Sequence, residues 1–414
     1  MVKEQILKIS REMEPELIRI RHTLHRHPEL SLKETFTATL IADTLRKLEG
    51  IRLQENMAEG TGVTGVLYGG KGPGRCVLLR ADIDALPIQE QVDIPFCSEV
   101  PGCMHACGHD AHTTWLLGAA MILSRLRNEF AGTVKFVFQP GEEIGGGACS
   151  LIQKDRVLEG PPVDAAFAAH AWPELPLGQI GIASRIPFGC AGGFELTILG
   201  KGGHGSWPYR CRNPISIAAE ICTRFQAIVA ERIDSAEPRV ISVGSIHAGD
   251  RSNIIPETCC MGGTIRASDP AVMEQLGREI EHTVRSITSM HGASYKLTLR
   301  TSGKPVENDS AMVRLVSSAA RDILGQENCL ILDKRYLGGE NFAEFSSRVP
   351  SCYFFAGIAT EETAGKFGLH SPNFELPDTV IAPVAAVFAR IALLALETES
   401  GTEADLSQSM TSLC

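Results

Sequence analysis

The chain has 414 residues, which is too long for one ordinary hydrophobic core, so two domains are expected. Its composition, 44% hydrophobic and 21% charged, is typical of a globular protein, and the net charge of −10 disfavours nucleic acid and anionic membranes as partners. No apolar run reaches the roughly 18 residues of a membrane helix, and the N-terminus lacks the apolar core of a secretory signal. Thirteen scattered cysteines fit a reducing compartment, so we expect a cytoplasmic protein.

The first part of the chain predicts two helices followed by an α/β sheet. Helical spacing begins at about Glu4 and is interrupted at Pro28, and a second helix is expected from about Lys33 to Leu48. An amphipathic segment from Ala111 to Arg127 is expected to form a crossover helix between strands. Short, nearly continuous apolar runs, typical of strands buried on both faces, occupy residues 76–81, 133–138 and 164–169. The predicted fold class is therefore α/β, with a mixed, largely parallel sheet and flanking helices.

The pattern then changes to strand, helix, strand, strand, helix, strand, which is the order of a split βαβ, ferredoxin-like domain. Asn213-Pro214 and Asp269-Pro270 supply a cap and a first-turn proline for its two helices. A domain inserted within a domain is the simplest account. The predicted boundaries are residues 1–190 for the first part of the catalytic domain, 191–301 for the insert, 302–400 for the second catalytic part and 401–414 for a flexible tail.

Metal-ligand chemistry is concentrated between Met104 and His112, where nine residues include a thiol, three imidazoles and a carboxylate. Cys107 and His109 alternate, so in an extended segment both would point to one side and could reach one metal centre. Further candidate ligands each follow an apolar, strand-like run: Glu142, Glu143, His170 and His370. A polar loop with a buried cysteine is the alternative for any one of these residues, but their coincidence favours a metal site.

The ordered motifs resemble those of the M20 family of metallopeptidases and amidohydrolases, in the branch of aminoacylases, hippurate hydrolases and plant auxin-conjugate hydrolases. The resemblance covers nearly all of residues 14–396. It rests on the segments Arg26-His27-Pro28-Glu29-Leu30, residues 80–87 (RADIDALP), residues 105–112 (HACGHDAH), residues 138–143 (FQPGEE), Gly202-Gly203-His204-Gly205 and His370-Ser371-Pro372.

The resemblance implies a site for two divalent cations per subunit. In it, Cys107 bridges the cations, His109 and His170 complete one coordination shell, and Glu143 and His370 complete the other. Mixed sulfur, nitrogen and oxygen ligands suit zinc, while related enzymes also use manganese, and cobalt or nickel remain candidates. The two remaining imidazoles of the motif, His105 and His112, are then expected to be loop or packing residues.

The paired glutamates are expected to differ in role, because neighbouring side chains on an extended segment face opposite ways. The resemblance assigns Glu143 to the metal and Glu142 to the attacking water, as general base and then as acid toward the leaving amine. A solvated acidic turn is the alternative. Asp84 and Asp110 are expected to orient the ligands from behind, and Asp82 to be structural.

The insert carries a second group of candidates. The glycine-rich segment at 200–205 lacks the following Lys-Ser or Lys-Thr of a phosphate loop, which disfavours a nucleotide. In proteins that this chain resembles, the His204 position reaches the active site of the partner subunit and binds the substrate carbonyl oxygen, which implies a homodimer through the insert. Asn253 and Arg266 are similar to contacts for a substrate carboxylate, although either could be an ordinary surface or turn residue.

The sequence departs from the family pattern at three positions, Asn341, Tyr209 and Asn213, where aspartate, histidine and aspartate are common. None of the three is a predicted ligand. The resulting prediction is a metal-dependent amidohydrolase that cleaves small-molecule N-acyl or N-aroyl amino acids to a carboxylic acid and a free amino acid. A dipeptidase or carboxypeptidase on the same scaffold is the nearest alternative, and a non-catalytic receptor for amino-acid conjugates is the alternative outside enzymes.

Overall fold

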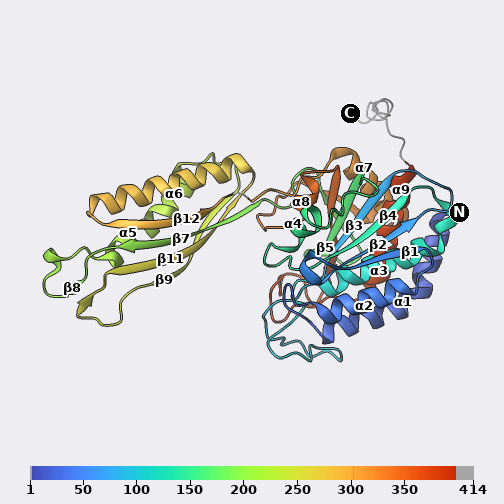
Figure 1. Ribbon diagram of the computed structural model, residues 1–414, viewed down its shortest axis with the longest axis horizontal. Helices are drawn as coiled ribbons and strands as arrows, with labels where there is room; N and C mark the ends of the chain where they lie inside the picture. Colours follow the sequence, from blue (N-terminus) through green and yellow to red (C-terminus); the bar gives the residue numbers. More distant parts are fainter. Residues whose placement is uncertain (1, 302, 398–414) are drawn as a thin grey trace. The chain divides into compact units, whose positions relative to one another are not determined.

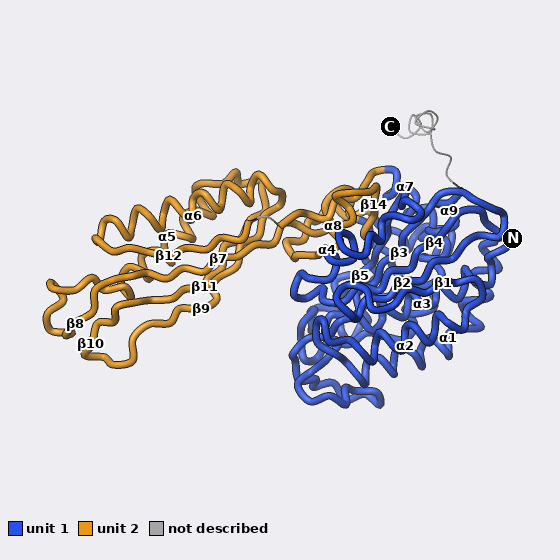
Figure 2. Tube along the Cα trace, viewed as in Figure 1, with its two compact units in different colours: residues 1–182, 311–330, 354–414 blue, residues 183–310, 331–353 orange. Residues whose placement is uncertain are grey.

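The computed structural model describes residues 2–301 and 303–397, and the predicted tail at 401–414 lies outside them. The chain divides into two compact units (Figure 2). Unit 1 comprises residues 1–182, 311–330 and 354–414, and unit 2 comprises residues 183–310 and 331–353. All five predicted metal ligands belong to unit 1, whereas His204, Asn253 and Arg266 belong to unit 2.

Among the described residues, the larger sheet has eight strands, and the predicted α/β class with a partly parallel sheet is confirmed (Figure 1). The order across this sheet is β1 (Ile51–Met57), β2 (Gly62–Tyr68), β4 (Thr133–Gln139), β3 (Cys76–Asp82), β5 (Ala165–Pro176), β14 (Ser351–Ala359), β6 (Ile180–Ala183) and β13 (Cys329–Leu332). β3 runs parallel to both β4 and β5, and every residue of β3 and β4 is buried, as the continuous apolar runs predicted. β3 and β4 end at Asp82 and Gln139, immediately before the segments that carry Asp84 and the paired glutamates.

Three helices of unit 1 pack against one another: α1 (Val2–Arg26), α3 (His109–Arg125) and α9 (Ile381–Glu397). Gly118 of α3 allows a close approach to α9, because a Cβ atom there would lie 2.7 Å from that of Ala385. The stretch Asp378–Glu397 is long and apolar enough to cross a bilayer, but 72% of an 18-residue window within it is buried inside the structure, as expected of a core helix. The other α-helices outside the ferredoxin-like part are α2 (Thr35–Arg46), α4 (Gly147–Gln153), α7 (Ser310–Leu324) and α8 (Ala343–Ser346). Short 3-10 helices occupy Ala58–Gly60, Arg127–Glu129, Pro208–Arg210, Gln326–Asn328 and Asp378–Val380.

Unit 2 contains the predicted ferredoxin-like arrangement. Its elements follow in the order β7 (Cys190–Leu199), α5 (Pro214–Glu231), β9 (Arg239–His247), β11 (Thr258–Ala267), α6 (Pro270–Met290) and β12 (Ser294–Arg300). The antiparallel sheet has the order β12-β7-β11-β9 (Figure 1), and its core is formed with α5 and α6. Both predicted caps are confirmed: the side chain of Asn213 accepts from the Ile215 amide, and that of Asp269 accepts from the Ala271 and Val272 amides. A separate two-stranded ribbon joins β8 (Gly203–His204) to β10 (Ile254–Ile255).

Candidate active site

The predicted metal ligands come from four segments of unit 1. Cys107 and His109 flank the start of α3, Glu143 lies in the turn after β4, His170 lies on β5, and His370 lies in the loop between β14 and α9. Cys107, His109 and Glu143 thus lie where a buried helix begins or just after a buried strand ends, whereas His170 lies within β5 and His370 lies in a long loop.

The expectation that Cys107 and His109 share an extended segment is wrong. His109 is the first residue of α3, and Gly108 before it has a φ of 85°, a left-handed conformation that glycine adopts without strain. The chain therefore turns between the two ligands. They are brought together by this turn at the start of the helix rather than by strand alternation.

The five side chains converge. The Sγ atom of Cys107 lies 3.4 Å from Nε2 of His170, and Oε1 of Glu143 lies 3.3 Å from Nε2 of His370 and 3.9 Å from Nε2 of His109. Two sets of three donor atoms, each within 4.8 Å of one another, share one thiol: Cys107 with His109 and His170, and Cys107 with Glu143 and His370. Two potential cation sites thus have one thiol in common.

The protonation chemistry of the cluster fits cation binding. Burial raises the pKa of the Cys107 thiol well above its usual value. Burial also opposes the charged form of His109, but the Asp82 carboxylate and the hydrogen bond to Asp84 outweigh it and raise the pKa of His109 well above its usual range. Thus both groups retain protons in a crowded, buried cluster, and a divalent cation would replace those protons while engaging the same lone pairs.

Buried polar atoms of His109 and Glu143 and the tautomer of His170 also fit cation binding. Among the described residues, neither Nε2 of His109 nor Oε1 of Glu143 has a hydrogen-bond partner, which is costly for buried polar atoms unless another ligand satisfies them. His170 donates from Nδ1 to the Ala171 carbonyl at 2.8 Å, so its Nε2 lone pair faces Cys107. The residues present therefore fit a metal pair.

A further group of possible ligands, Asp82, His109 and His112, is explained by internal contacts instead. His112 pairs through Nδ1 with Asp82 at 2.6 Å and accepts at Nε2 from the Ala171 amide at 2.9 Å, so both ring nitrogens are engaged. Asp82 also accepts from Arg80 at 2.7 Å. His112 and Asp82 thus have the packing and structural contacts that the sequence led us to expect.

His105 has a different environment from His112. It is 1% exposed, neither of its ring nitrogens has a hydrogen-bond partner among the described residues, and burial lowers its pKa to about 4. A neutral imidazole is consistent with a packing role.

Asp84 contacts both the ligands and the segments that carry them. Its Oδ1 lies 3.2 Å from Nδ1 of His109, and its Oδ2 accepts from the Glu143 amide at 3.1 Å and from Ser31 Oγ at 2.6 Å. Although burial raises it, these hydrogen bonds lower the pKa of Asp84, which keeps the carboxylate charged. Asp84 can therefore orient one ligand ring while it holds the backbone of another ligand.

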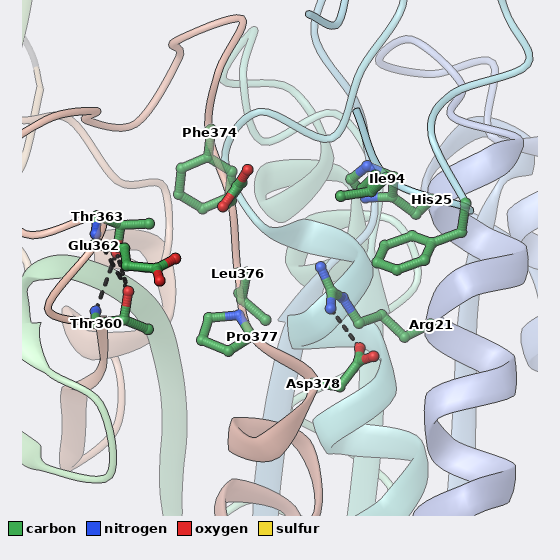
Figure 3. Close-up of a pocket in the computed structure, with 12 residues that line it drawn as sticks. Arg21, His25, Ile94, Thr360, Glu362, Thr363, Phe374, Leu376, Pro377 and Asp378 are labelled. Atoms are coloured by element: carbon green, nitrogen blue, oxygen red, sulfur yellow. Dashed lines mark hydrogen bonds and ion pairs between the residues drawn. The ribbon is translucent and has the colours of Figure 1, made fainter. Parts of the chain in front are cut away.

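Asp110 contacts a buried charge network rather than a ligand side chain. Its Oδ2 accepts from Arg21 at 3.2 Å and lies 2.9 Å from Nδ1 of His25, both on α1. Arg21 also donates to Asp378 at 2.6 Å, in the 3-10 turn before α9, as the dashed line in Figure 3 shows. Asp110 thus ties the first turn of α3 to α1, and through Arg21 to the residues that follow the His370 loop.

Glu142 lies in a turn, so the expectation that the paired glutamates share an extended segment is wrong. The Gly145 amide donates to the Glu142 carbonyl at 2.9 Å, and both glutamates are partly exposed. The structure still places a Glu142 oxygen within 4.8 Å of donor atoms of His109 and Glu143. Glu142 therefore belongs to the same cluster as two of the predicted ligands.

Glu34 organises this turn, and nothing in the sequence marked it as a site residue. Glu34 is fully buried, and its two oxygens accept from the Gly141 amide at 2.9 Å and from Thr61 Oγ1 at 2.7 Å. Burial raises its pKa. Its position in the second predicted helix gives no indication of a contact with a residue 107 positions away.

In unit 2 the structure brings together two of the three candidates. His204 on β8 pairs with Ile254 on β10, and the Gly205 amide donates to the Asn253 carbonyl at 2.9 Å. Both His204 and Asn253 are exposed.

Arg266 lies apart from that ribbon, on β11. It is partly buried, and its Nη1 donates to the carbonyls of Gly192 and Ile265. Burial lowers its pKa. Part of its guanidinium therefore has a structural use within unit 2.

The three departures from the family pattern also lie in unit 2. Asn213 caps α5, Tyr209 is 76% exposed, and the carbonyl of Asn341 accepts from the Glu344 amide at the start of α8.

Comparison with known proteins places this arrangement in a family. The model of peptidase family M20/M25/M40 matches residues 78–394. The chain is 40% identical over 308 residues to the N-acyl-L-amino acid amidohydrolase of Geobacillus stearothermophilus, covering 74% of this chain and 82% of that protein. It is 36% identical to thermostable carboxypeptidase 2 of Saccharolobus solfataricus, covering 94% and 98%.

Among solved structures, the YXEP protein of Bacillus subtilis, described as a dinuclear metal-binding peptidase of the M20 family, is similar with a TM-score of 0.79 and 32% identity, covering 94% of this chain and 100% of that one. The match of the family model over most of the chain agrees with the convergent thiol, imidazole and carboxylate groups described above. The protein is a hydrolase that belongs to peptidase family M20/M25/M40.

Proposed function

We propose that the protein is a two-metal amidohydrolase that converts N-acyl or N-aroyl amino acids into a carboxylic acid and a free amino acid. The observation that carries the proposal is the pair of ligand trios that share Cys107, with Glu142 beside them. The amidohydrolase from Geobacillus supports this substrate class.

The cations and the side chains have different roles in the proposed reaction. A pair of divalent cations, when bound by the two trios, supplies Lewis-acid polarisation of the amide carbonyl and lowers the pKa of a nearby water. Glu142 accepts a proton from the water while the water oxygen bonds to the carbonyl carbon. Glu142 then delivers that proton to the amide nitrogen of the substrate as the carbon–nitrogen bond breaks. Asp84 holds the His109 ring and the Glu143 backbone in place throughout.

His204 is proposed to stabilise the developing oxyanion from the partner subunit of a homodimer. The Ser206 amide donates to its Nδ1 at 3.1 Å, so the neutral ring carries its proton on Nε2 and can donate outward from an exposed side chain. The exposed edge strand β9, with Val240 and Ile246 37% and 46% exposed, offers a surface for symmetric pairing of two copies.

Asn253 and Arg266 are proposed as contacts for the substrate carboxylate. The support for Asn253 is its position beside His204 on the same ribbon. Arg266 has a planar guanidinium that suits a carboxylate, although its Nη1 is already used by backbone carbonyls. We propose zinc or manganese as the metal, with cobalt or nickel as further candidates, and the cytoplasm as the location.

A dipeptidase or carboxypeptidase activity is the second candidate, favoured by the similarity to the Saccharolobus carboxypeptidase. Both candidates use the same site and differ in the acyl half of the substrate. A hydrolysis screen therefore compares N-acetyl, N-benzoyl, indole-acetyl and long-chain acyl amino acids with dipeptides, together with metal analysis of the same preparation.

Preferred release of amino acid from the N-acyl compounds is expected, with about two metal ions per chain. Preferred cleavage of dipeptides would favour the second candidate. Absence of turnover on every substrate with saturating metal would instead indicate a binding protein for amino-acid conjugates.

A further inference from the structure

A hollow of about 620 Å³ in unit 1 is lined by residues that are close in sequence to two predicted metal ligands, and none of the functional roles above uses it. It is formed between the end of β5 and the loop that precedes His370. Its apolar lining comes from Trp172, Pro173, Pro176, Phe367 and Leu369. A mostly apolar concavity of this size is typical of a site for a small organic group.

The hollow adjoins two predicted ligands. Trp172 follows His170 by two residues on β5, so their side chains lie on the same face of the strand, and the two rings meet edge to face with centroids 6.0 Å apart. On the other side, Leu369 directly precedes His370, whose amide donates to the Ala106 carbonyl at 2.8 Å. When the carbonyl carbon of a substrate is held at the metal-ligand cluster, the acyl substituent on that carbon could therefore extend into the hollow.

The two sides of the hollow, Trp172 on β5 and the loop before His370, are each held by internal contacts. Trp172 is held against Phe355, with ring centroids 4.5 Å apart, and only 7% of its surface is exposed. In the loop, the Ala364 amide donates to the Thr360 carbonyl and the Lys366 amide donates to the Thr363 carbonyl, which form successive turns. Phe367, at 39% exposed, is an apolar side chain of this loop that is open to solvent.

The charges of the lining indicate which half of a substrate it accepts. Glu174 and Lys366 are both exposed and carry opposite charges, so the lining as a whole offers no net positive charge to a carboxylate. The amino-acid half of a substrate bears a carboxylate, which needs dedicated donors. The uncharged acyl half needs only apolar contact.

We infer that this hollow binds the acyl group of the substrate and that it selects aromatic or long apolar acyl groups over acetyl. The inference rests on the proposed function, since it assumes that an acyl group is attacked at the metal cluster. Another hollow of unit 1, shown in Figure 3, is less suited to this role, because its lining includes the Arg21–Asp378 ion pair.

The test uses the metal-loaded full-length chain and two variants of the loop. Phe367→Ala removes apolar surface from the hollow, and Ala364→Trp partly fills it. Phe36→Ala is the matched control, because Phe36 on α2 is 40% exposed and lies outside the hollow. Each protein is assayed on N-acetyl-, N-benzoyl- and N-decanoyl-alanine, which vary the acyl group, and on N-acetyl-phenylalanine, which varies the amino acid.

For Phe367→Ala, the ratio of kcat/KM for benzoyl- or decanoyl-alanine to that for acetyl-alanine is expected to fall about tenfold, as loss of part of an aromatic contact predicts. Ala364→Trp should lower the same ratio by a similar or larger factor, mainly through KM, and Phe36→Ala should leave it unchanged. An unchanged ratio in both loop variants would overturn the inference. A change in only the preference between N-acetyl-phenylalanine and N-acetyl-alanine would also overturn it. If the unaltered protein hydrolysed no N-acyl amino acid at all, the proposed function itself would be refuted.

Discussion

Replacing Asp84 tests whether the metal ligands are held in place by the contacts behind them. Asp84→Asn keeps the shape of the side chain and removes its charge, and Asp84→Ala removes its contacts with Ser31, His109 and Glu143 altogether. In the structure this carboxylate accepts from Ser31 and the Glu143 amide at 2.6 and 3.1 Å and lies 3.2 Å from His109 Nδ1. We expect both variants to bind metal more weakly.

The magnitude follows from the kind of hydrogen bond that is lost. A hydrogen bond to a charged group contributes about 1.5–3 kcal/mol, and each 1.4 kcal/mol corresponds to about a tenfold change in affinity. Substitution of a group that orients a metal ligand weakens metal binding by about 10–100-fold. Asp84→Asn, which retains a neutral acceptor, should lie near tenfold, and Asp84→Ala near 100-fold.

The assay is competition for metal with a chromophoric chelator, which measures affinity without relying on turnover. Thermal unfolding of the metal-free proteins shows whether the variants remain folded. Asp43→Asn is the control, since Asp43 is an exposed aspartate of α2 paired with Arg46. Wild-type metal affinity in both folded Asp84 variants would refute the positioning role.

Three further predictions test the ligands, the charge network and the dimer. Cys107→Ala should lose both metal and activity while it still unfolds cooperatively; a variant with two metal ions per chain and normal turnover would exclude the bridging thiolate. His25, whose pKa is raised to about 9 by Asp110 and Glu90 against the effect of burial, should stabilise the fold below about pH 6.5 and lose that contribution as pH rises through 9. The difference in unfolding free energy between wild type and His25→Gln should therefore shrink by up to about 3 kcal/mol between pH 6.5 and 9, and a pH-independent difference would contradict this. Mixed dimers of His204→Ala and Glu142→Gln subunits should recover one working site, so no recovery after confirmed subunit exchange would exclude sharing of the site.

The strands and candidate ligands could be predicted from the sequence because their determinants are local. Apolar runs such as 133–138 can be buried on both faces only in a covered sheet, and β4 occupies Thr133–Gln139. The concentration of unusual residues around Cys107 likewise marks a site before any folding is considered. The caps at Asn213 and Asp269 depend only on neighbouring residues.

The contacts behind the ligands could not be predicted, because they join distant positions. Arg21 and Asp110 are separated by 89 residues, and Glu34 and Gly141 by 107. Periodicity places Arg21 on a helix without indicating which helix it will face. The turn at Gly108 was also missed, since a ligand–glycine–ligand segment is compatible with either a strand or the start of a helix.

The proposed hydrolysis depends on metal ions and on distinct roles for two adjacent glutamates. The most direct measurement compares Glu142→Gln and Glu143→Gln for metal content and for turnover of an N-acyl amino acid that the unaltered protein hydrolyses. Glu142→Gln should retain two metal ions per chain and lose about 10²–10⁴-fold in kcat, as removal of a proton-transfer group predicts, whereas Glu143→Gln should lose metal. Equal metal loss in both variants, or a Glu142→Gln protein with undiminished turnover, would contradict the account.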